Sequence, residues 1–251
     1  MSGHSKWSSI KHKKGAADAK RGKLFSKLSR AIIVAAKEGG ADPGGNLALQ
    51  NAIEKARSYS MPKDNIERAI AKGAGEGTDA AEFATVIYEG YGPEGVAVIV
   101  EALTDNRNRT ASEIRHAFTR HGGSLGATGA VAWQFERRGV VVVGADGVDE
   151  DELFLAAADG GAEDIERDGD VFEITSAPEN LAAVRNAIEA AGFTAESAEL
   201  SMVPKNTVAV EDATAAKRVM RLIEELEDND DVQDVYANFD IPDQVLEAVA
   251  S

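Results

Sequence analysis

Lysine and arginine side chains are concentrated near the amino terminus of the chain. Residues 3–32 contain nine of them and only one acidic residue, Asp18. Cations at this density can neutralise the phosphates of a nucleic acid and release its counterions. If about six engage, the logarithm of the binding constant falls with the logarithm of salt concentration at a slope of roughly −4 to −5. The alternative is a solvated charge run without a ligand. The candidate phosphate contacts are Lys6, Lys11, Lys13, Lys14, Lys20, Arg21, Lys23, Lys27 and Arg30.

Two side chains with aromatic rings in this basic segment are further candidate contacts. Trp7 could stack on an exposed base, which is worth about 1–3 kcal/mol in single-strand binders, or it could anchor the segment to the helices that follow. His12 could contact a phosphate when protonated, although imidazole is mostly neutral near pH 7. Because lysine outnumbers arginine in the segment, we expect point-charge contact with the backbone more than bidentate reading of bases.

A second pair of cations, Arg107 and Arg109, lies just before a predicted helix. The pattern Thr-Ala-Ser-Glu at 110–113 is a capping box and predicts that the helix begins there. The positive end of a helix dipole disfavours cations by about 0.3–1 kcal/mol, so two arginines are tolerable there if an anion binds between them and the helix amides. A nucleic-acid phosphate would serve, and so would ion pairing with an acid such as Asp105. The sequence leaves both interpretations open.

Residues that could support catalysis or metal binding form no recognisable site. The chain has no cysteine, which removes thiolate ligands and cysteine nucleophiles. Between Gly15 and the Gly-Lys pair at 22–23 there are six residues, where a phosphate-binding loop needs four. His116 and His121 lie five positions apart on one predicted helix and do not share a face. We therefore expect no enzyme activity, no catalytic residue, no cofactor and no metal site.

The charge of the chain is divided unevenly along its length. Its formal net charge is −16, yet residues 1–75 hold 15 Lys and Arg against 6 Asp and Glu, and residues 76–251 hold 12 against 37. Such asymmetry indicates an electrostatic partner for one part of the chain. The alternative, that the basic segment docks onto the acidic remainder, stays open.

The elements that must position these side chains begin with three predicted helices. Apolar residues recur at helix spacing from Leu24 and again after Asn46, which can cap a helix. Pro62 suits the first turn of a third helix, and Gly73 its end. We therefore expect a basic helical amino-terminal domain over residues 1–78.

Strands are expected from Phe83 onward. The β-branched runs 83–89, 96–103 and 131–135 predict strands, and a helix over 110–121 lies between the last two. Near the carboxyl end, apolar residues of 219–226 share one helical face and 232–239 predicts a strand. We expect this last pair to complete the sheet begun at Phe83, giving an α/β middle domain over 79–137 plus 206–251.

Residues 138–205 are expected to be an insertion into that middle domain. Their predicted order is strand, helix, two strands, helix and strand, which is the ferredoxin-like βαββαβ arrangement. This stretch carries 4 basic and 16 acidic residues. The predicted fold class is therefore α+β with three domains: an N-terminal three-helix domain, an α/β middle domain and an inserted ferredoxin-like domain.

Several long motifs resemble those of one protein family. Gly-His-Ser-Lys-Trp at 3–7 with Ile-Lys-His-Lys-Lys at 10–14, the run 61–70, Asp-Asn-Arg-Asn-Arg-Thr at 105–110 and Gly-Gly-Ser-Leu-Gly at 122–126 are similar to the YebC/PmpR family. The resemblance implies a three-domain α/β fold and a probable transcriptional regulatory protein that binds DNA. A related mitochondrial member is a translational activator of cytochrome c oxidase, and bacterial relatives have been linked to the ribosome.

We therefore expect a cytoplasmic, non-enzymatic regulator of transcription that binds DNA through its basic N-terminal domain, with no membrane partner. One alternative is a translation factor that binds structured RNA, such as ribosomal RNA. Another is a protein–protein interaction module without nucleic acid. A transcription or ribosomal protein could serve as an additional partner.

Overall fold

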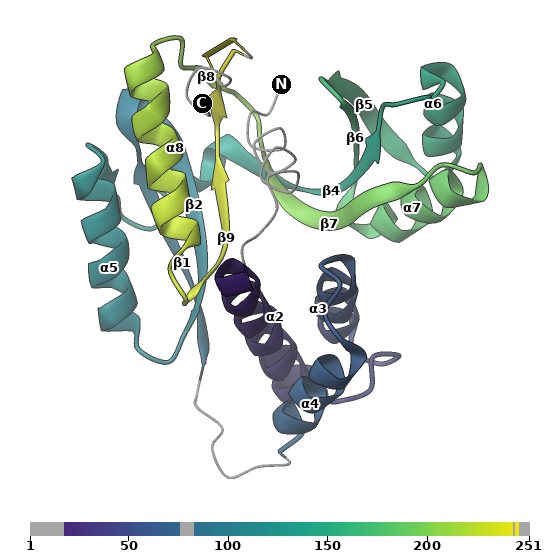
Figure 1. Ribbon diagram of the computed structural model, residues 1–251, viewed down its shortest axis with the longest axis horizontal. Helices are drawn as coiled ribbons and strands as arrows, with labels where there is room; N and C mark the ends of the chain where they lie inside the picture. The colour runs from purple at the N-terminus through teal and green to yellow at the C-terminus, as the bar shows by residue number, and fades with distance from the viewer. Residues whose placement is uncertain (1–17, 76–82, 243, 246–251) are drawn as a thin grey trace. The chain divides into compact units, whose positions relative to one another are not determined.

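The computed structural model describes residues 18–75, 83–242 and 244–245 (Figure 1). These residues form two compact units. One comprises 132–209 and 238–240, and the other contains the remaining described residues. None of the helices in the described part of the chain has the length and apolarity that crossing a bilayer would need.

Three helices form the amino-terminal part of the larger unit. The apolar residues predicted at helix spacing make its core, among them Ile32 and Leu49, which are fully buried. Asn46 caps the second helix as expected, accepting a hydrogen bond from the Leu49 backbone N–H at 3.1 Å. Gly73 allows close packing, because a Cβ at this position would lie 2.5 Å from the Ile33 carbonyl oxygen. The helices are α2 (Asp18–Gly39), α3 (Leu47–Ser58) and α4 (Lys63–Gly73).

A four-stranded sheet, which we call the middle sheet, forms the rest of the larger unit. Its order is β3-β1-β2-β9 and all its pairings are antiparallel. Pairing of β9 with β2 confirms that the carboxyl-terminal strand completes the sheet begun near Phe83. Two helices, α5 and α8, cover one face of it (Figure 1). The elements are β1 (Ala84–Tyr91), the 3-10 turn η1 (Pro93–Gly95), β2 (Ala97–Thr104), α5 (Arg107–Arg120), β3 (Ser124–Leu125), α8 (Ala213–Glu227) and β9 (Val232–Ala237).

The strand predicted over 131–135 is wrong. Residues 132–134 form a short 3-10 turn, and only Phe135 belongs to a strand. The buried carboxylate of Glu89 accepts the backbone N–H groups of Gly129 and Val131 at 2.6 and 2.8 Å. Because these donors are bonded to a side chain, they do not pair with a neighbouring strand.

The smaller unit has the predicted ferredoxin-like element order, with a sheet of order β5-β6-β4-β7. Val141, Leu153, Phe172 and Ile188 lie in its core. The domain boundaries expected from the sequence stay predictions. The elements are β4 (Phe135–Gly144), α6 (Glu150–Asp159), β5 (Ala162–Asp168), β6 (Val171–Ser176), η3 (Pro178–Asn180), α7 (Leu181–Ala190) and β7 (Ala195–Pro204), with η2 (Ala132–Gln134) before them and the short parallel pair β8 (Val208–Ala209) and β10 (Phe239–Asp240) beside them in the unit.

Candidate nucleic-acid interface

The structure describes only some of the predicted site residues. Lys20 and Arg21 belong to the first turns of α2, and their side chains are outside what is described. Five predicted cations have described side chains: Lys23, Lys27, Arg30, Arg107 and Arg109. Those that lie outside the described residues altogether are Lys6, Trp7, Lys11, His12, Lys13 and Lys14.

Two lysines of α2 contact the carboxyl-terminal end of α8. Lys27 Nζ donates to the Glu227 carbonyl oxygen at 2.5 Å, and Lys23 Nζ lies 3.5 Å from the Asp228 carbonyl oxygen. Lys23 also lies 4.0 Å from Asp230 Oδ1. The last carbonyl groups of a helix have no partner within it and carry its partial negative charge, so cations stabilise this end. The lysines therefore contribute to holding α2 against the turn that follows α8.

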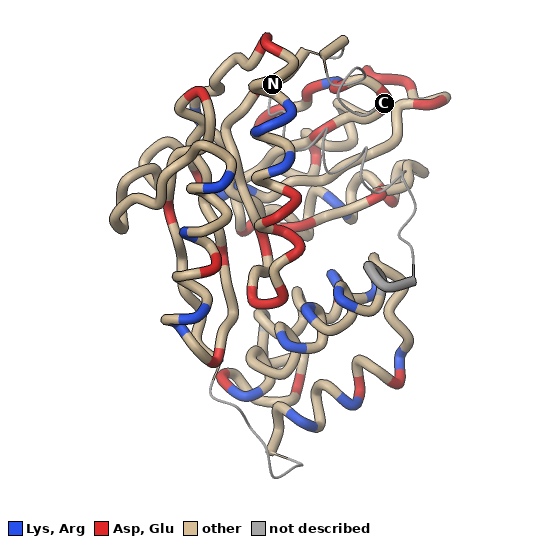
Figure 2. Tube along the Cα trace, turned by 60° about the vertical axis from the view of Figure 1, so that its left-hand side comes forward, with Lys and Arg blue, Asp and Glu red and all other residues tan. Residues whose placement is uncertain are grey.

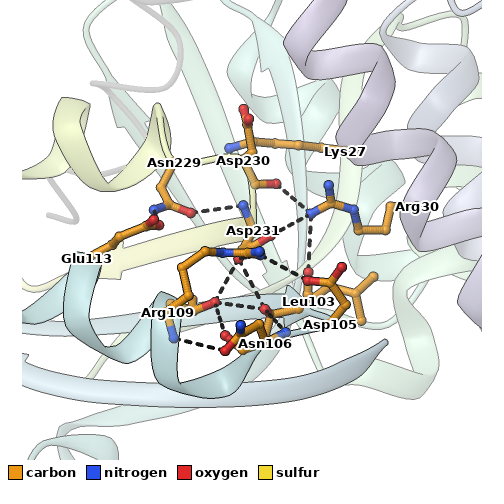
Figure 3. Close-up of polar contacts among 12 residues, drawn as sticks. Lys27, Arg30, Leu103, Asp105, Asn106, Arg109, Glu113, Asn229, Asp230 and Asp231 are labelled. Carbon is orange, nitrogen blue, oxygen red and sulfur yellow. Dashed lines mark hydrogen bonds and ion pairs between the residues drawn. The ribbon is translucent and has the colours of Figure 1, made fainter. Parts of the chain in front are cut away.

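A buried carboxylate, Asp231, is the centre of the polar contacts at this junction (Figure 3). Its Oδ1 accepts from Arg30 Nη1 at 3.1 Å, and its Oδ2 accepts from Arg109 Nη2 at 2.7 Å. The hydroxyls of Thr110 and Thr104 donate to Oδ2 at 2.7 and 3.1 Å. One acid from the turn between α8 and β9 thus joins α2, β2 and α5.

Neighbouring oxygens also accept hydrogen bonds from the same nitrogen of each guanidinium group. Arg30 Nη1 also donates to the carbonyl oxygens of Asp230 and Leu103, at 2.8 and 3.3 Å. Its guanidinium carbon lies 5.1 Å from the centre of the Phe83 ring. Arg109 Nη2 also donates to Asp105 Oδ1 at 3.0 Å. Both arginines are therefore engaged by the protein itself (Figure 3).

The hydrogen bonds at this junction favour the charged forms of its groups. Burial alone would raise the pKa of the Asp231 carboxyl, but hydrogen bonds from Arg109, Thr110 and Thr104 outweigh burial and lower that pKa. Hydrogen bonds to Asp231 and then to Asp105 raise the pKa of Arg109. At neutral pH, Asp231 is therefore an anion and Arg109 a cation.

The prediction that Arg107 and Arg109 lie in a loop before the helix is wrong. They form the first turn of α5, which is capped by Asn106 through a 3.1 Å bond from the Arg109 backbone N–H. Thr110, the predicted cap, instead donates its hydroxyl hydrogen to Asp231. The sequence left two anions open for this arginine pair, a nucleic-acid phosphate or an acid of the chain. Arg109 pairs with two acids of the chain, Asp105 and Asp231, while the Arg107 side chain is exposed.

The cations predicted from the sequence therefore differ in their surroundings. Lys23, Lys27, Arg30 and Arg109 contact acids or carbonyl groups of the same chain, so a phosphate that bound them would replace an existing contact. Docking of the basic segment onto acidic residues, one of the two open alternatives, is found for this part of α2. Binding of these residues to nucleic acid stays a prediction.

Two features of this region were not predicted from the sequence. Asp231 was not singled out, although the acidic run at 227–231 directly follows a predicted helix and could have indicated a docking point for cations. The other is a set of exposed cations on the middle sheet's helices, which the total charge of residues 76–251 conceals: Arg115, Arg120, Lys217, Arg218 and Arg221. Within the described residues, no group of three or more His, Cys, Asp or Glu side chains could hold a metal ion.

Comparisons with known proteins cover nearly the whole chain. Residues 5–76 match the family model described as "TACO1/YebC protein N-terminal domain", and residues 83–239 match "TACO1/YebC second and third domain". A "probable transcriptional regulatory protein" of Rubrobacter xylanophilus is 59% identical over 250 residues, covering 100% of each chain. A relative with the same description from Dictyoglomus thermophilum is 54% identical, also over 100% of each chain.

A solved structure has the same fold. The conserved hypothetical protein Aq1575 from Aquifex aeolicus is 51% identical, superposes with a TM-score of 0.82, and covers 91% of this chain and 94% of its own. The mixed helix-and-sheet, three-domain organisation predicted from the sequence is therefore confirmed.

Proposed function

The chain belongs to the TACO1/YebC family, and on that premise we propose that it is a regulator of transcription that binds DNA through its basic amino-terminal segment. Relatives at 59% and 54% identity over their full length are described as probable transcriptional regulatory proteins, which supports a regulatory role. The DNA contact and the segment that makes it are our own proposal.

The observation that carries this proposal is the division of charge. The first 75 residues hold 15 Lys and Arg against 6 Asp and Glu, in a chain whose net charge is −16. A polyanion is attracted to the first part and repelled by the remainder. Binding is therefore directed to basic parts of the surface and away from the acidic parts, which limits non-specific accumulation of the protein along DNA.

Contacts at the α8–β9 turn indicate which cations carry the binding. Because Lys27 and Arg30 already donate to carbonyl and carboxylate oxygens, a phosphate gains little from them. Exposed cations of the helical domain keep their charge available to solvent, including Arg57, Lys63 and Lys72. We assign the main phosphate contacts to the amino-terminal lysines Lys6, Lys11, Lys13 and Lys14. The exposed cations of the helical domain add to these contacts.

We also propose that the protein acts by binding and has no enzymatic activity. Its contribution is then occupancy of a site on DNA, alone or with a protein of the transcription machinery.

Binding of a short, fluorophore-labelled DNA duplex of mixed sequence tests the proposal. We compare the full chain with a variant carrying Lys11→Ala, Lys13→Ala and Lys14→Ala, across a salt series. Loss of three phosphate contacts reduces the slope of log K against log salt by roughly 2.7. An unchanged slope and affinity would remove the segment from DNA binding, and the absence of any binding by the folded wild-type chain would refute the proposal.

The control variant carries Arg137→Ala, Arg167→Ala and Lys205→Ala, three exposed cations of the ferredoxin-like unit. It changes the net charge by the same amount, so an effect of charge alone would appear in both variants. We expect this control to bind as the wild type does.

A second candidate function, a translation factor that binds ribosomal RNA, is favoured by one observation. Seven of the nine cations in residues 3–32 are lysine, and lysine contacts phosphate as a point charge without reading bases. Crosslinking in cells followed by sequencing of the attached nucleic acid separates the candidates. Enrichment of promoter DNA supports the first, and enrichment of ribosomal RNA supports the second.

A further inference from the structure

The cations outside the amino-terminal segment are gathered on two helices. Residues 76–251 contain 12 Lys and Arg and 37 Asp and Glu. Seven of those 12 cations lie on α5 and α8, which carry only 4 of the 37 acids. The rest of residues 76–251 holds only five cations against 33 acids, so the charge of this segment is distributed unevenly.

The two helices pack side by side and antiparallel on one face of the middle sheet. At one end, Glu113 of α5 accepts a 2.7 Å bond from Asn229, just after α8. Further along, Arg120 and His121 at the end of α5 both contact Glu225 of α8, at 3.5 and 2.6 Å. A Cβ added to Gly122, after α5, would lie 4.0 Å from the Arg218 guanidinium. The end of α5 therefore lies next to the first half of α8.

This packing collects cations at one end of the helical layer, in what we call the α5–α8 basic cluster. Figure 2 shows basic residues along α5 and along the first half of α8, and acidic residues on the second half of α8. The cluster side chains are exposed because the apolar residues of both helices, such as Phe118 and Leu222, are buried against the sheet. The members are Arg115, Arg120, Lys217, Arg218 and Arg221.

Contacts within the chain leave most of the cluster's charge available. Arg120 pairs with Glu225 at 3.5 Å and Arg218 with Glu94 at 3.6 Å, while the two arginine side chains are 63% and 52% exposed. Exposed pairs of this kind contribute about 0–1 kcal/mol and exchange readily. Within the described residues, no ion pair joins Arg115, Lys217 or Arg221 to an acid.

From this arrangement we infer that the α5–α8 basic cluster is a second binding surface for the phosphodiester backbone of nucleic acid. The inference rests on the proposed function and adds to it a second contact region, distant in sequence from the amino-terminal segment. Four of the five members are arginine, whose planar guanidinium matches two phosphate oxygens at once.

A polyanion fits this surface better than a protein partner does. Protein interfaces are centred on buried aromatic and aliphatic side chains. The large apolar side chains that are exposed in the described structure are Ile87, Trp133, Phe154 and Leu155, and none of them is on α5 or α8. The surface therefore offers charge without the apolar centre that a protein interface requires.

The second half of α8 carries acidic residues, which repel phosphate. A groove of about 480 Å³ between α5 and α8 is lined there by Glu113, Glu225 and Asp228, with His116. Its carboxylates border the basic cluster. They confine a nucleic-acid strand to the end of the layer where the first half of α8 meets the end of α5.

The test uses the full chain with Lys217→Ala, Arg218→Ala and Arg221→Ala, and the same labelled DNA duplex across a salt series. At ~0.1 M salt, each released counterion contributes about 0.9 to log K, or roughly eightfold. We expect the slope to fall by about 1.8 to 2.7 and the affinity to fall roughly 60- to 500-fold for loss of two to three contacts. The charge-matched control with Arg137→Ala, Arg167→Ala and Lys205→Ala should leave both unchanged.

A charge-retaining variant, with Arg218→Lys and Arg221→Lys, guards against misfolding. It should keep the wild-type slope, because one positive charge remains at each position. If the alanine variant binds like the wild type or like the control, the inference is overturned. Loss of binding in the Lys11, Lys13 and Lys14 variant alone would still support the proposed function. If the wild type binds no DNA, both fall together.

Discussion

Replacement of Asp231 by asparagine tests whether this residue holds α2, β2 and α5 together. The change keeps the shape of the side chain and removes its charge. Oδ1 faces Arg30 at 3.1 Å and Oδ2 faces Arg109 at 2.7 Å. A guanidinium group can only donate, so whichever way the new amide turns, its NH₂ group faces an arginine. One arginine therefore loses its acceptor on residue 231.

The cost follows from burial and from the charges involved. The Asp231 side chain is 6% exposed, while those of Arg30 and Arg109 are 21% and 44% exposed. Breaking a fully buried pair costs about 3–5 kcal/mol, and solvent around the arginines screens part of that. We expect Asp231→Asn to lower the free energy of unfolding by about 2–4 kcal/mol, or roughly 30- to 900-fold in the unfolding equilibrium constant.

The effect should also depend on pH. The pKa of Asp231 is lowered in the folded protein, because hydrogen bonds from Arg109, Thr110 and Thr104 outweigh the opposing effect of burial. A carboxyl of this kind stabilises the fold fully above its unfolded pKa of about 3.9, and the contribution is lost as pH falls through the folded pKa. The difference between wild type and Asp231→Asn should therefore be equal at about pH 7 and pH 5 and smaller at about pH 3.

Hydrogen–deuterium exchange of peptides from α5 and β9, measured along a urea series, reports the stability of this region separately from the ferredoxin-like unit. The matched control is Asp230→Asn, since the Asp230 side chain is 72% exposed and lies 4.0 Å from its partner Lys23. We expect this control to change stability by less than about 0.5 kcal/mol. Equal stability of the two variants, or a difference between wild type and Asp231→Asn that is as large at pH 3 as at pH 7, would refute the reasoning.

Three other substitutions, one of them compared with Gly22→Ala, test the packing that positions the candidate surfaces, each by urea unfolding. Asn46→Ala removes the cap of α3 and two donated bonds to backbone carbonyls at 2.7 and 2.8 Å, and should cost about 2–3 kcal/mol. Gly73→Ala places a Cβ 2.5 Å from the Ile33 carbonyl oxygen and should cost about 1–3 kcal/mol, whereas Gly22→Ala, with nothing within 4 Å, should stabilise α2 by about 0.5–1 kcal/mol. Glu89→Gln points an amide at one of two backbone N–H groups it now accepts, and should cost about 1–3 kcal/mol and speed amide exchange at 129–131.

Local patterns were sufficient for most elements of the fold. The helix spacing that predicted Ile32 and Leu49 as core residues depends only on which side chains share a face, and both are fully buried. The ferredoxin-like order was predictable because each strand and helix there is bounded by its own turn residues, such as Gly169 with φ of 62° between β5 and β6.

Errors arose where a distant residue decided between two local possibilities. Both Asn106 and Thr110 are good helix caps, and Asp231, more than a hundred residues later, accepts the Thr110 hydroxyl hydrogen. In the same way, Glu89 accepts the backbone N–H of Val131, the first residue of the predicted strand over 131–135, and that of Gly129 just before it. Sequence spacing contains no information on such pairings.

The candidate site shows the same limit. The count of cations in residues 3–32 is a property of the sequence, but the partner of Lys27 is a carbonyl oxygen 200 residues away. Averaging charge over residues 76–251 also concealed the cluster on α5 and α8, because its members come from two segments that meet only after the sheet has formed.

The position of the ferredoxin-like unit within the chain has a consequence for the order of folding. Phe135 and Pro204 are paired in neighbouring strands, and the Lys205 N–H donates to the Gln134 carbonyl oxygen at 2.8 Å. Once this unit has folded, about seventy residues no longer lengthen the loop between β2 and β9, which lowers the entropic cost of closing it by roughly 0.7 kcal/mol. On the ribosome, the strands and helices from β4 to β7 are synthesised before β9. The middle sheet therefore acquires its last strand late in translation, and a nascent chain gains the joined helical layer only when nearly all of it has been made.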